Sequence, residues 1–405
     1  MKESNLTCTH CGKIYPVDRV DPRCDSCAEP LEVEGVTEGR IREGDVFHQT
    51  ILERYADFFP FSESERMISL REGFTPLVRS SRLASELGVR SVWFKNESQN
   101  PTWSFKDRGT AAGVNHALSL GYESIGTVSS GNMAVSVAAY GARAQLRTVI
   151  LVAANIPPEK LGPIAIYDPL LIRVDGDYGD LYFQSLAIGK ECGIYFINSD
   201  VPFRVEGSKT IAFEICEELN FETPDFVIVP TSSGGNLRGI MKGFEEFFQC
   251  GLIRHVPRFI CAQARGCAPI YRAYSEHAEK VSPFHDPDTI AHAIKNPFPP
   301  SGNEILRKIR EKDGIVVAVG DDEILRAQKR LAEEGIFGQP AGAVPLAALT
   351  RLREDGTIDE KSTVVCIMTG GGLKYTAALE LHDLKVAECG IEDLSDYVKR
   401  HADKG

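Results

Sequence analysis

Lys106 is the residue of this chain whose setting could make it a nucleophile. It lies in the segment NPTWSFKDRG at residues 100–109, shortly after the apolar stretch at residues 91–95. A lysine held at the end of a strand can form a Schiff base with a carbonyl compound if burial lowers the pKa of its amine. The alternative is a lysine at the start of a surface helix, paired with Asp107, and such ion pairs are commoner than catalytic amines. The neighbouring turns help to choose between the two.

A glycine-rich turn follows the apolar run at residues 225–230 and precedes a helical pattern. The turn consists of Thr231, Ser232, Ser233, Gly234, Gly235 and Asn236. Successive backbone amides at the start of a helix can bind a phosphate. The turn lacks both the Lys-Ser/Thr of a nucleotide P-loop and the spaced glycines of the dinucleotide fingerprint. It therefore favours a cofactor monophosphate over ATP or NAD, although a glycine turn without any ligand remains an alternative.

Two more turns follow apolar runs in the same way. Ser129, Ser130, Gly131 and Asn132 come after residues 124–128 and open a helical pattern. The Asn132 side chain either caps that helix, which is its commonest role, or donates a hydrogen bond to a ligand. Thr369 follows residues 363–368 and precedes three glycines, which permit close approach of the backbone. We expect the Thr369 hydroxyl to point into the same crevice, unless it is an ordinary loop threonine.

The first thirty or so residues carry a different pattern, two Cys-x-x-Cys pairs. They consist of Cys8 with Cys11 and Cys24 with Cys27, separated by twelve residues. Thiolates in this arrangement suit tetrahedral zinc, and a module this small has too little apolar area to fold without a metal or disulfides. The pattern predicts structural Zn²⁺. The alternatives are two disulfides, or a knuckle that keeps its cysteines without metal.

From about residue 91 the chain alternates short β-branched runs with longer amphipathic stretches, which predicts parallel sheets with helices on both faces. The predicted strands are 124–128, 147–152, 170–174, 194–197, 225–229, 258–262 and 363–368. The predicted helices are 107–118, 133–144, 181–192, 207–219, 237–248, 322–334 and 343–353. Ligands of such sheets bind beyond the carboxyl ends of the strands, where all three turns lie. Residues 281–303 show no periodicity and are predicted to be a surface excursion or a lid.

Composition narrows the class of protein. The chain has 405 residues, enough for two lobes and an appendage, and a net charge of −12. This charge argues against nucleic-acid binding, because such proteins usually present a basic face. No apolar run is long enough for a membrane span, and the first residues lead into no secretory signal. We therefore expect a cytoplasmic protein, whose eleven cysteines are reduced.

Together these elements resemble the fold type II family of pyridoxal phosphate enzymes, most closely its zinc-ribbon-bearing threonine synthases. The resemblance runs from Cys8 to about Lys374, and residues 100–109 are similar to the family's NPTGSFKDRG. It implies a two-lobed α/β fold with twisted, parallel-type sheets plus an N-terminal zinc ribbon. The implied domains are 1–35 for the ribbon, 36–95 with 200–405 for the large domain, and 96–199 for the small one. By analogy with the fold family, a homodimer is expected.

The resemblance also implies roles for particular residues. Lys106 would carry pyridoxal 5'-phosphate and move protons, Asn132 would contact the phenolic oxygen of the cofactor, and Thr369 would face the pyridine nitrogen. The implied phosphate cradle consists of Ser232, Ser233, Gly234, Gly235 and Asn236. The implied contacts to the phosphate of the substrate come from Arg204, Ser129 and Ser130. The implied reaction converts O-phospho-L-homoserine and water to L-threonine and phosphate.

The chain departs from the family pattern at several positions. The family usually has glycine at Trp103, threonine at Met133, Gly-Asn at Ser232 and Ser233, and histidine at Gly371. We expect Trp103 and Met133 to border the pocket, with Trp103 buried. The departures keep open β-replacement or elimination on a phosphorylated amino acid such as O-phosphoserine, and deamination of threonine or serine. An inactive cofactor-binding scaffold whose zinc ribbon recruits a partner is the alternative outside enzymes.

Overall fold

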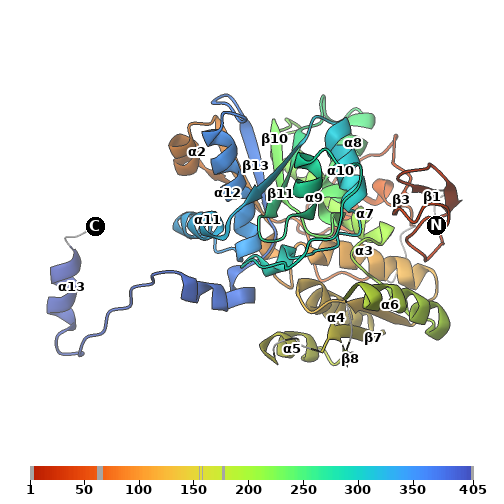
Figure 1. Ribbon diagram of the computed structural model, residues 1–405, viewed down its shortest axis with the longest axis horizontal. Helices are drawn as coiled ribbons and strands as arrows, with labels where there is room; N and C mark the ends of the chain where they lie inside the picture. Colours follow the sequence, from red (N-terminus) through yellow and green to blue (C-terminus); the bar gives the residue numbers. More distant parts are fainter. Residues whose placement is uncertain (1–3, 62–66, 155, 157, 176–177, 403–405) are drawn as a thin grey trace.

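The computed structural model describes residues 4–61, 67–154, 156, 158–175 and 178–402. These residues form three sheets, a large one and a smaller one that are both flanked by helices, and a small one near the N-terminus (Figure 1). No helix within the described ranges combines the length and the apolar character that crossing a bilayer requires.

The large sheet has six strands in the order β12-β11-β10-β13-β5-β4. Its strands are β4 Leu77–Ser80, β5 Ser91–Asn96, β10 Phe226–Pro230, β11 Arg258–Ala264, β12 Ile315–Val319 and β13 Thr363–Met368. All pairs are parallel except β4 with β5. β10 and β13 are neighbours, so the turns that follow them open at the same edge of the sheet.

The smaller sheet has four parallel strands in the order β8-β7-β6-β9. Its strands are β6 Ser124–Val128, β7 Arg147–Ala153, β8 Leu170–Val174 and β9 Tyr195–Phe196. β6 lies inside this sheet, and it ends at the turn that contains Ser129.

Among the described residues, six helices lie between residues 106 and 249, before or after the strands β6 to β10 along the chain. They are α3 Lys106–Ser119, α4 Asn132–Ala144, α5 Pro158–Ala165, α6 Tyr178–Cys192, α7 Pro202–Glu218 and α8 Gly235–Gln249. The remaining helices of five or more residues before residue 372 are α2 Ser81–Leu87, α9 Pro269–Ser275, α10 Gly302–Glu311, α11 Asp321–Glu333 and α12 Pro340–Glu354. The short α1 is Ile51–Arg54. α4 and α8 start directly at predicted turns, as helices that begin at the carboxyl end of a strand do.

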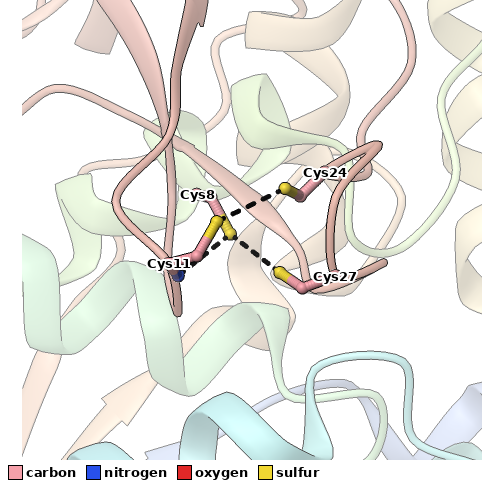
Figure 2. Close-up of side chains that lie close together, drawn as sticks. All are labelled: Cys8, Cys11, Cys24 and Cys27. Carbon is pink, nitrogen blue, oxygen red and sulfur yellow. Dashed lines mark hydrogen bonds between the residues drawn. The ribbon is translucent and has the colours of Figure 1, made fainter.

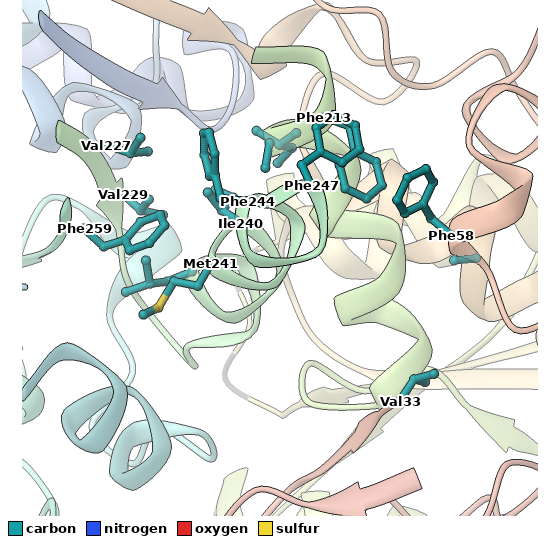
Figure 3. Packing of buried hydrophobic residues seen from close by; sticks show 14 of the residues in the cluster. Val33, Phe58, Phe213, Val227, Val229, Ile240, Met241, Phe244, Phe247 and Phe259 are labelled. Carbon is teal, nitrogen blue, oxygen red and sulfur yellow. The ribbon is translucent and has the colours of Figure 1, made fainter. Parts of the chain in front are cut away.

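The N-terminal sheet, β2-β1-β3, packs against the body of the protein. Its strands are β1 Asn5–Cys8, β2 Ile14–Pro16 and β3 Leu31–Val33. Val33 belongs to the same buried hydrophobic cluster as Phe58, Phe213 and Phe247, and the rings of the last two stack with centroids 4.2 Å apart (Figure 3). The N-terminal module therefore shares a core with α7 and α8.

The seven predicted strands and the seven predicted helices are all present, and no end differs from the prediction by more than five residues. The alternation of elements did not predict β12, which continues the large sheet beyond β11. Beyond residue 381 the chain leaves the body as an extended arm that ends in α13 Leu394–Ala402 (Figure 1).

Candidate active site

A cavity of about 720 Å³ lies where the three turns and the start of α3 meet. Every residue that the sequence assigned to cofactor or substrate lines it: Lys106, Ser129, Ser130, Asn132, Arg204, Ser232, Ser233, Gly234, Gly235, Asn236 and Thr369. These residues come from the turns after β6, β10 and β13 and the helix starts that follow them, from the start of α3, and from α7, so the fold brings together positions that are far apart along the chain.

Lys106 is the first residue of α3, and its amine lies 4.4 Å from the centre of the Phe105 ring. Removal from solvent, together with the nearby positive charge of Arg204, lowers the pKa of Lys106 to about 7. Asp107 does not pair with it: the buried Asp107 carboxylate accepts hydrogen bonds from the Thr102 amide at 2.7 Å and from the Ser136 hydroxyl at 2.6 Å. The surface ion pair considered from the sequence is thus absent among the described residues.

Arg204 is held next to Lys106 because α3 and α7 approach each other at glycines. A Cβ on Gly207 would lie 2.1 Å from the Arg108 carbonyl oxygen, and one on Gly109 would lie 2.9 Å from the Arg204 carbonyl oxygen. The buried Arg204 guanidinium donates a hydrogen bond to the Thr110 hydroxyl at 3.1 Å. Burial lowers the pKa of Arg204 to about 10, so the side chain stays charged at neutral pH.

The turn after β10 has the geometry of an anion cradle. Gly234 adopts a φ of +100°, which favours glycine, and a Cβ on Gly235 would lie 2.6 Å from the Ser199 carbonyl oxygen. Both polar atoms of the Asn236 side chain are buried, and neither has a hydrogen-bond partner among the described residues. A buried amide without partners is costly, so a ligand that bonds to it would remove an energetic penalty.

The turns after β6 and β13 complete the lining. Asn132 is the first residue of α4, and its side-chain amide donates to the Gln339 side-chain oxygen at 3.3 Å. The Thr369 carbonyl oxygen accepts a hydrogen bond from the Phe105 amide at 3.1 Å, and Gly371 donates to the Trp103 carbonyl oxygen at 3.0 Å. These backbone bonds tie the turn after β13 to the segment that carries Lys106.

Several lining residues were missed from the sequence. Lys374 donates to the Thr102 carbonyl oxygen at 2.7 Å, and burial lowers its pKa to about 8. Gln339 and His292 also line the cavity, and His292 belongs to the segment 281–303 for which we expected a surface excursion or lid. Lys374 could have been found, because it stands in the glycine-rich turn of Thr369, whereas no local pattern marks Gln339.

The expectation for Trp103 is wrong, and that for Met133 is confirmed in its position. Trp103 is 56% exposed and is not part of the cavity lining. Its φ of +62° lies in the left-handed region, which is uncommon for a residue other than glycine. Met133 is buried and lines the cavity. Of these two departures, Met133 is the one that reaches the site.

The four cysteines of the N-terminal module converge (Figure 2). The Sγ atoms of Cys8, Cys11, Cys24 and Cys27 all lie within 4.8 Å of one another, with Cys8 and Cys27 at 3.4 Å and Cys11 and Cys24 at 3.6 Å. A tetrahedral zinc site with bonds of 2.3 Å requires sulfur separations of about 3.8 Å. All four thiols are free, so the disulfide alternative is not what the structure shows.

Residues 68–370 match the model of a family described as pyridoxal-phosphate dependent enzymes. The chain belongs to this family. It is 41% identical to the threonine synthase of Methanocaldococcus jannaschii over 91% of this chain and 92% of that protein. It is 36% identical to the threonine synthase of Methanosarcina acetivorans over 91% and 92%, which places it with the threonine synthases. The predicted family and its dependence on pyridoxal phosphate are confirmed.

Solved structures agree on the fold. Maize serine racemase superposes with a TM-score of 0.65 at 21% identity over 81% of this chain and 93% of that chain. A tomato (Solanum lycopersicum) threonine deaminase gives 0.63 at 21% identity over 82% and 84%. At this identity the likeness concerns architecture alone, and it confirms the predicted two-lobed α/β fold class.

Proposed function

We propose that this protein converts O-phospho-L-homoserine and water to L-threonine and phosphate. The observation that carries the proposal is the convergence of Lys106, the glycine cradle after β10 and the buried Arg204 on one cavity, in a chain closely similar to threonine synthases. The cavity offers Lys106 for a covalent bond, the cradle after β10 for the phosphate of a cofactor, and Arg204 as a separate cation for the phosphate of a substrate.

The residues of the cavity fit pyridoxal phosphate. The Gly234–Gly235 backbone and the unsatisfied Asn236 amide would hold its phosphate at the start of α8, where the helix dipole favours an anion. Ser232 and Ser233 would add hydroxyl donors. When bound, the cofactor withdraws electrons from the carbon atoms next to the amino group of the substrate.

Asn132 and Thr369 would orient the ring of the cofactor. The Asn132 amide, held by Gln339, would donate to the phenolic oxygen. The Thr369 hydroxyl would face the pyridine nitrogen. Because a neutral hydroxyl does not stabilise a proton on that nitrogen as a carboxylate would, this contact favours elimination and replacement over transamination.

Lys106 and Arg204 would act on the substrate. With its pKa lowered to about 7, the Lys106 amine can both accept and return a proton near neutral pH, at Cα and at Cβ. Arg204, with Ser129 and Ser130, would hold the phosphate as the Cγ–O bond breaks, by charge-assisted hydrogen bonds. Phosphate leaves Cγ with the electrons of the broken bond, and a proton taken from Cβ is returned at Cγ, which becomes a methyl group. Water then adds its hydroxyl at Cβ, its other proton balances the one taken up by the released phosphate, and the proton removed from Cα is returned there.

We further propose that the four cysteines bind one structural Zn²⁺, since their separations are close to those of a four-thiolate site. The proposed domains are residues 1–35, residues 36–95 with 200–405, and residues 96–199. β6 to β9 fall inside the last range, and the strands of the large sheet fall inside the second, except that β5 ends one residue beyond it, at Asn96.

The test offers four compounds separately to the purified protein: O-phosphohomoserine, O-phosphoserine, threonine and serine. Release of phosphate from the first alone, with formation of threonine, is the expected result. Release of phosphate from O-phosphoserine would select a sister elimination activity, and ammonia from threonine would select deamination. A protein that binds pyridoxal phosphate and turns over none of the four would be an inactive scaffold.

A further inference from the structure

Arg23 of the N-terminal module reaches out of that module into the body of the protein. It directly precedes Cys24, and its guanidinium forms an ion pair with Asp200. The same Nη2 atom donates to the Pro300 carbonyl oxygen at 3.1 Å. The Asp200 side chain is almost fully buried and also accepts the Tyr182 hydroxyl at 2.6 Å. A buried carboxylate needs such partners, so Arg23 fixes the place of Asp200.

Asp200 lies in the connection between the two lobes. Residues 197–201 lead from β9 of the four-stranded sheet to α7, which packs on α8 so tightly that a Cβ on Gly243 would lie 2.4 Å from the Lys209 carbonyl oxygen. Ser199, one residue before Asp200, lines the cavity. Its carbonyl oxygen is the atom that a Cβ on Gly235 would meet. The position of Asp200 therefore bears on the phosphate cradle.

Pro300 leads to the same cradle from the other side. Ser301 follows it, and its amide donates to the Ser233 carbonyl oxygen at 3.0 Å. The Ser301 hydroxyl accepts from Arg238 of α8 at 3.2 Å, and Arg238 also donates to the Leu31 carbonyl oxygen of β3 at 3.1 Å. Arg23 thus contacts two segments, that of Asp200 and that of Pro300, and each of these segments touches the turn after β10.

We propose that Arg23 is a positioning residue for the cofactor site. By holding Asp200 and Pro300, it sets the backbone of Ser199 and Ser301 against Gly235 and Ser233, and so keeps the cradle open to a phosphate. It touches neither cofactor nor substrate. The N-terminal module then contributes to cofactor affinity, in addition to its share of the core. The inference rests on the proposed binding of pyridoxal phosphate at this turn.

The experiment uses three test variants: Arg23→Gln, Asp200→Asn, and the double variant that combines them. Arg307→Gln is the control with which they are compared. Arg307 is a matched control, because it also joins the body to the module, through Glu29 at 3.3 Å, but its partner lies in the module and not in the segments of Asp200 and Pro300. The dissociation constant of pyridoxal phosphate is measured by absorbance titration, together with kcat and KM. Circular dichroism and the zinc content of each variant report whether the module stays folded.

We expect Arg23→Gln to weaken cofactor binding about tenfold, with kcat at saturating cofactor nearly unchanged, and Arg307→Gln to stay within about twofold. Because Arg23 acts through Asp200, the double variant should lose no more cofactor affinity than the single variant that loses more. Equal dissociation constants for Arg23→Gln and Arg307→Gln would overturn the inference, as would additive losses in the double variant. If the wild-type protein bound no pyridoxal phosphate, the proposed function would fail instead.

Discussion

Lys106 and Lys209 lie in two different regions of this protein, and their surroundings act on the charge of the two amines in opposite ways. In the layer between α7 and α8, the Lys209 amine contacts the carboxylates of Glu206 at 2.6 Å and Glu246 at 2.9 Å, and these charges raise its pKa. At the start of α3, the Lys106 amine faces a cavity, has no carboxylate partner among the described residues, and has its pKa lowered to about 7. The carboxylates around Lys209 keep its amine charged and hold it in place. The Lys106 amine lacks such a partner, so it can lose its proton near neutral pH and react.

The largest effect is expected for Lys106→Ala. The variant should lose at least about 10³-fold in kcat, because both the covalent attachment and the proton transfers depend on this amine. Its free energy of unfolding should not fall, since no ion pair is broken. Steady-state release of phosphate and urea unfolding measure the two quantities. Residual activity within tenfold of wild type would place the reactive amine elsewhere.

Lys209→Met is expected to do the opposite: it should lower stability and leave kcat nearly unchanged. It leaves Glu206 and Glu246 with less compensation inside the protein, and removing one partner of a buried pair costs about 3–5 kcal/mol of unfolding free energy. The kcat per folded molecule should stay within about twofold of wild type. Lys329→Met, on the exposed side of α11, is the control and should change stability by less than about 0.5 kcal/mol. Equal stabilities of the two variants would refute the structural role of Lys209.

The pH dependence of stability tests the charge of Lys106 directly. In the cofactor-free protein its pKa is about 7 when folded and near the ordinary 10.5 when unfolded. Between these values the unfolded chain binds more protons, so the free energy of unfolding rises with pH, by at most about 1.4 kcal/mol per unit from this residue. Below pH 7 both states are protonated and the contribution is flat at its lowest value.

Urea unfolding of wild type and Lys106→Ala at pH 6, 7, 8 and 9 isolates this contribution as the difference between the two proteins. The difference should be constant up to pH 7 and should then grow in favour of wild type. Parallel curves over the whole range would mean that the folded Lys106 amine keeps its ordinary pKa.

Lys374 is the intermediate case, since it lines the cavity but donates to the Thr102 carbonyl oxygen. Lys374→Gln should keep the covalent cofactor and lower kcat/KM by roughly tenfold, about 1.4 kcal/mol, because the segment that carries Lys106 loses one tie. The Lys374→Met variant, which cannot donate, should lose at least as much. A loss as large as that of Lys106→Ala would assign Lys374 to the chemistry itself.

The sequence predicted the turns of the site better than the buried charges in the layer between α7 and α8. Lys106, Asn132, Gly234 and Thr369 follow apolar runs, and parallel strands bring the residues after them to one edge. No sequence pattern marks Lys209 and Glu206 as buried. Charged residues on a helix usually face solvent, so the sequence predicts both to be exposed. Their burial results from the close contact of α7 with α8 at glycines, which is a tertiary effect.

Trp103 shows a second limit of the sequence. A large aromatic residue near a pocket is expected to be buried, but the backbone at this position has a positive φ, and the side chain is exposed. In this conformation the Trp103 carbonyl oxygen accepts a hydrogen bond from the Gly371 amide. Residues far apart in the sequence form that bond, so local pattern did not reveal it.

The most direct test of the contrast between the lysines is the site of covalent labelling. The protein is incubated with pyridoxal phosphate, reduced with borohydride, digested and analysed by mass spectrometry. We expect a pyridoxyl label on Lys106 at close to one per chain, with no label on Lys209 or on the buried Lys95, whose amine pairs with the Glu214 carboxylate at 2.8 Å. A principal label on Lys374, or on any of the paired buried lysines, would contradict this expectation.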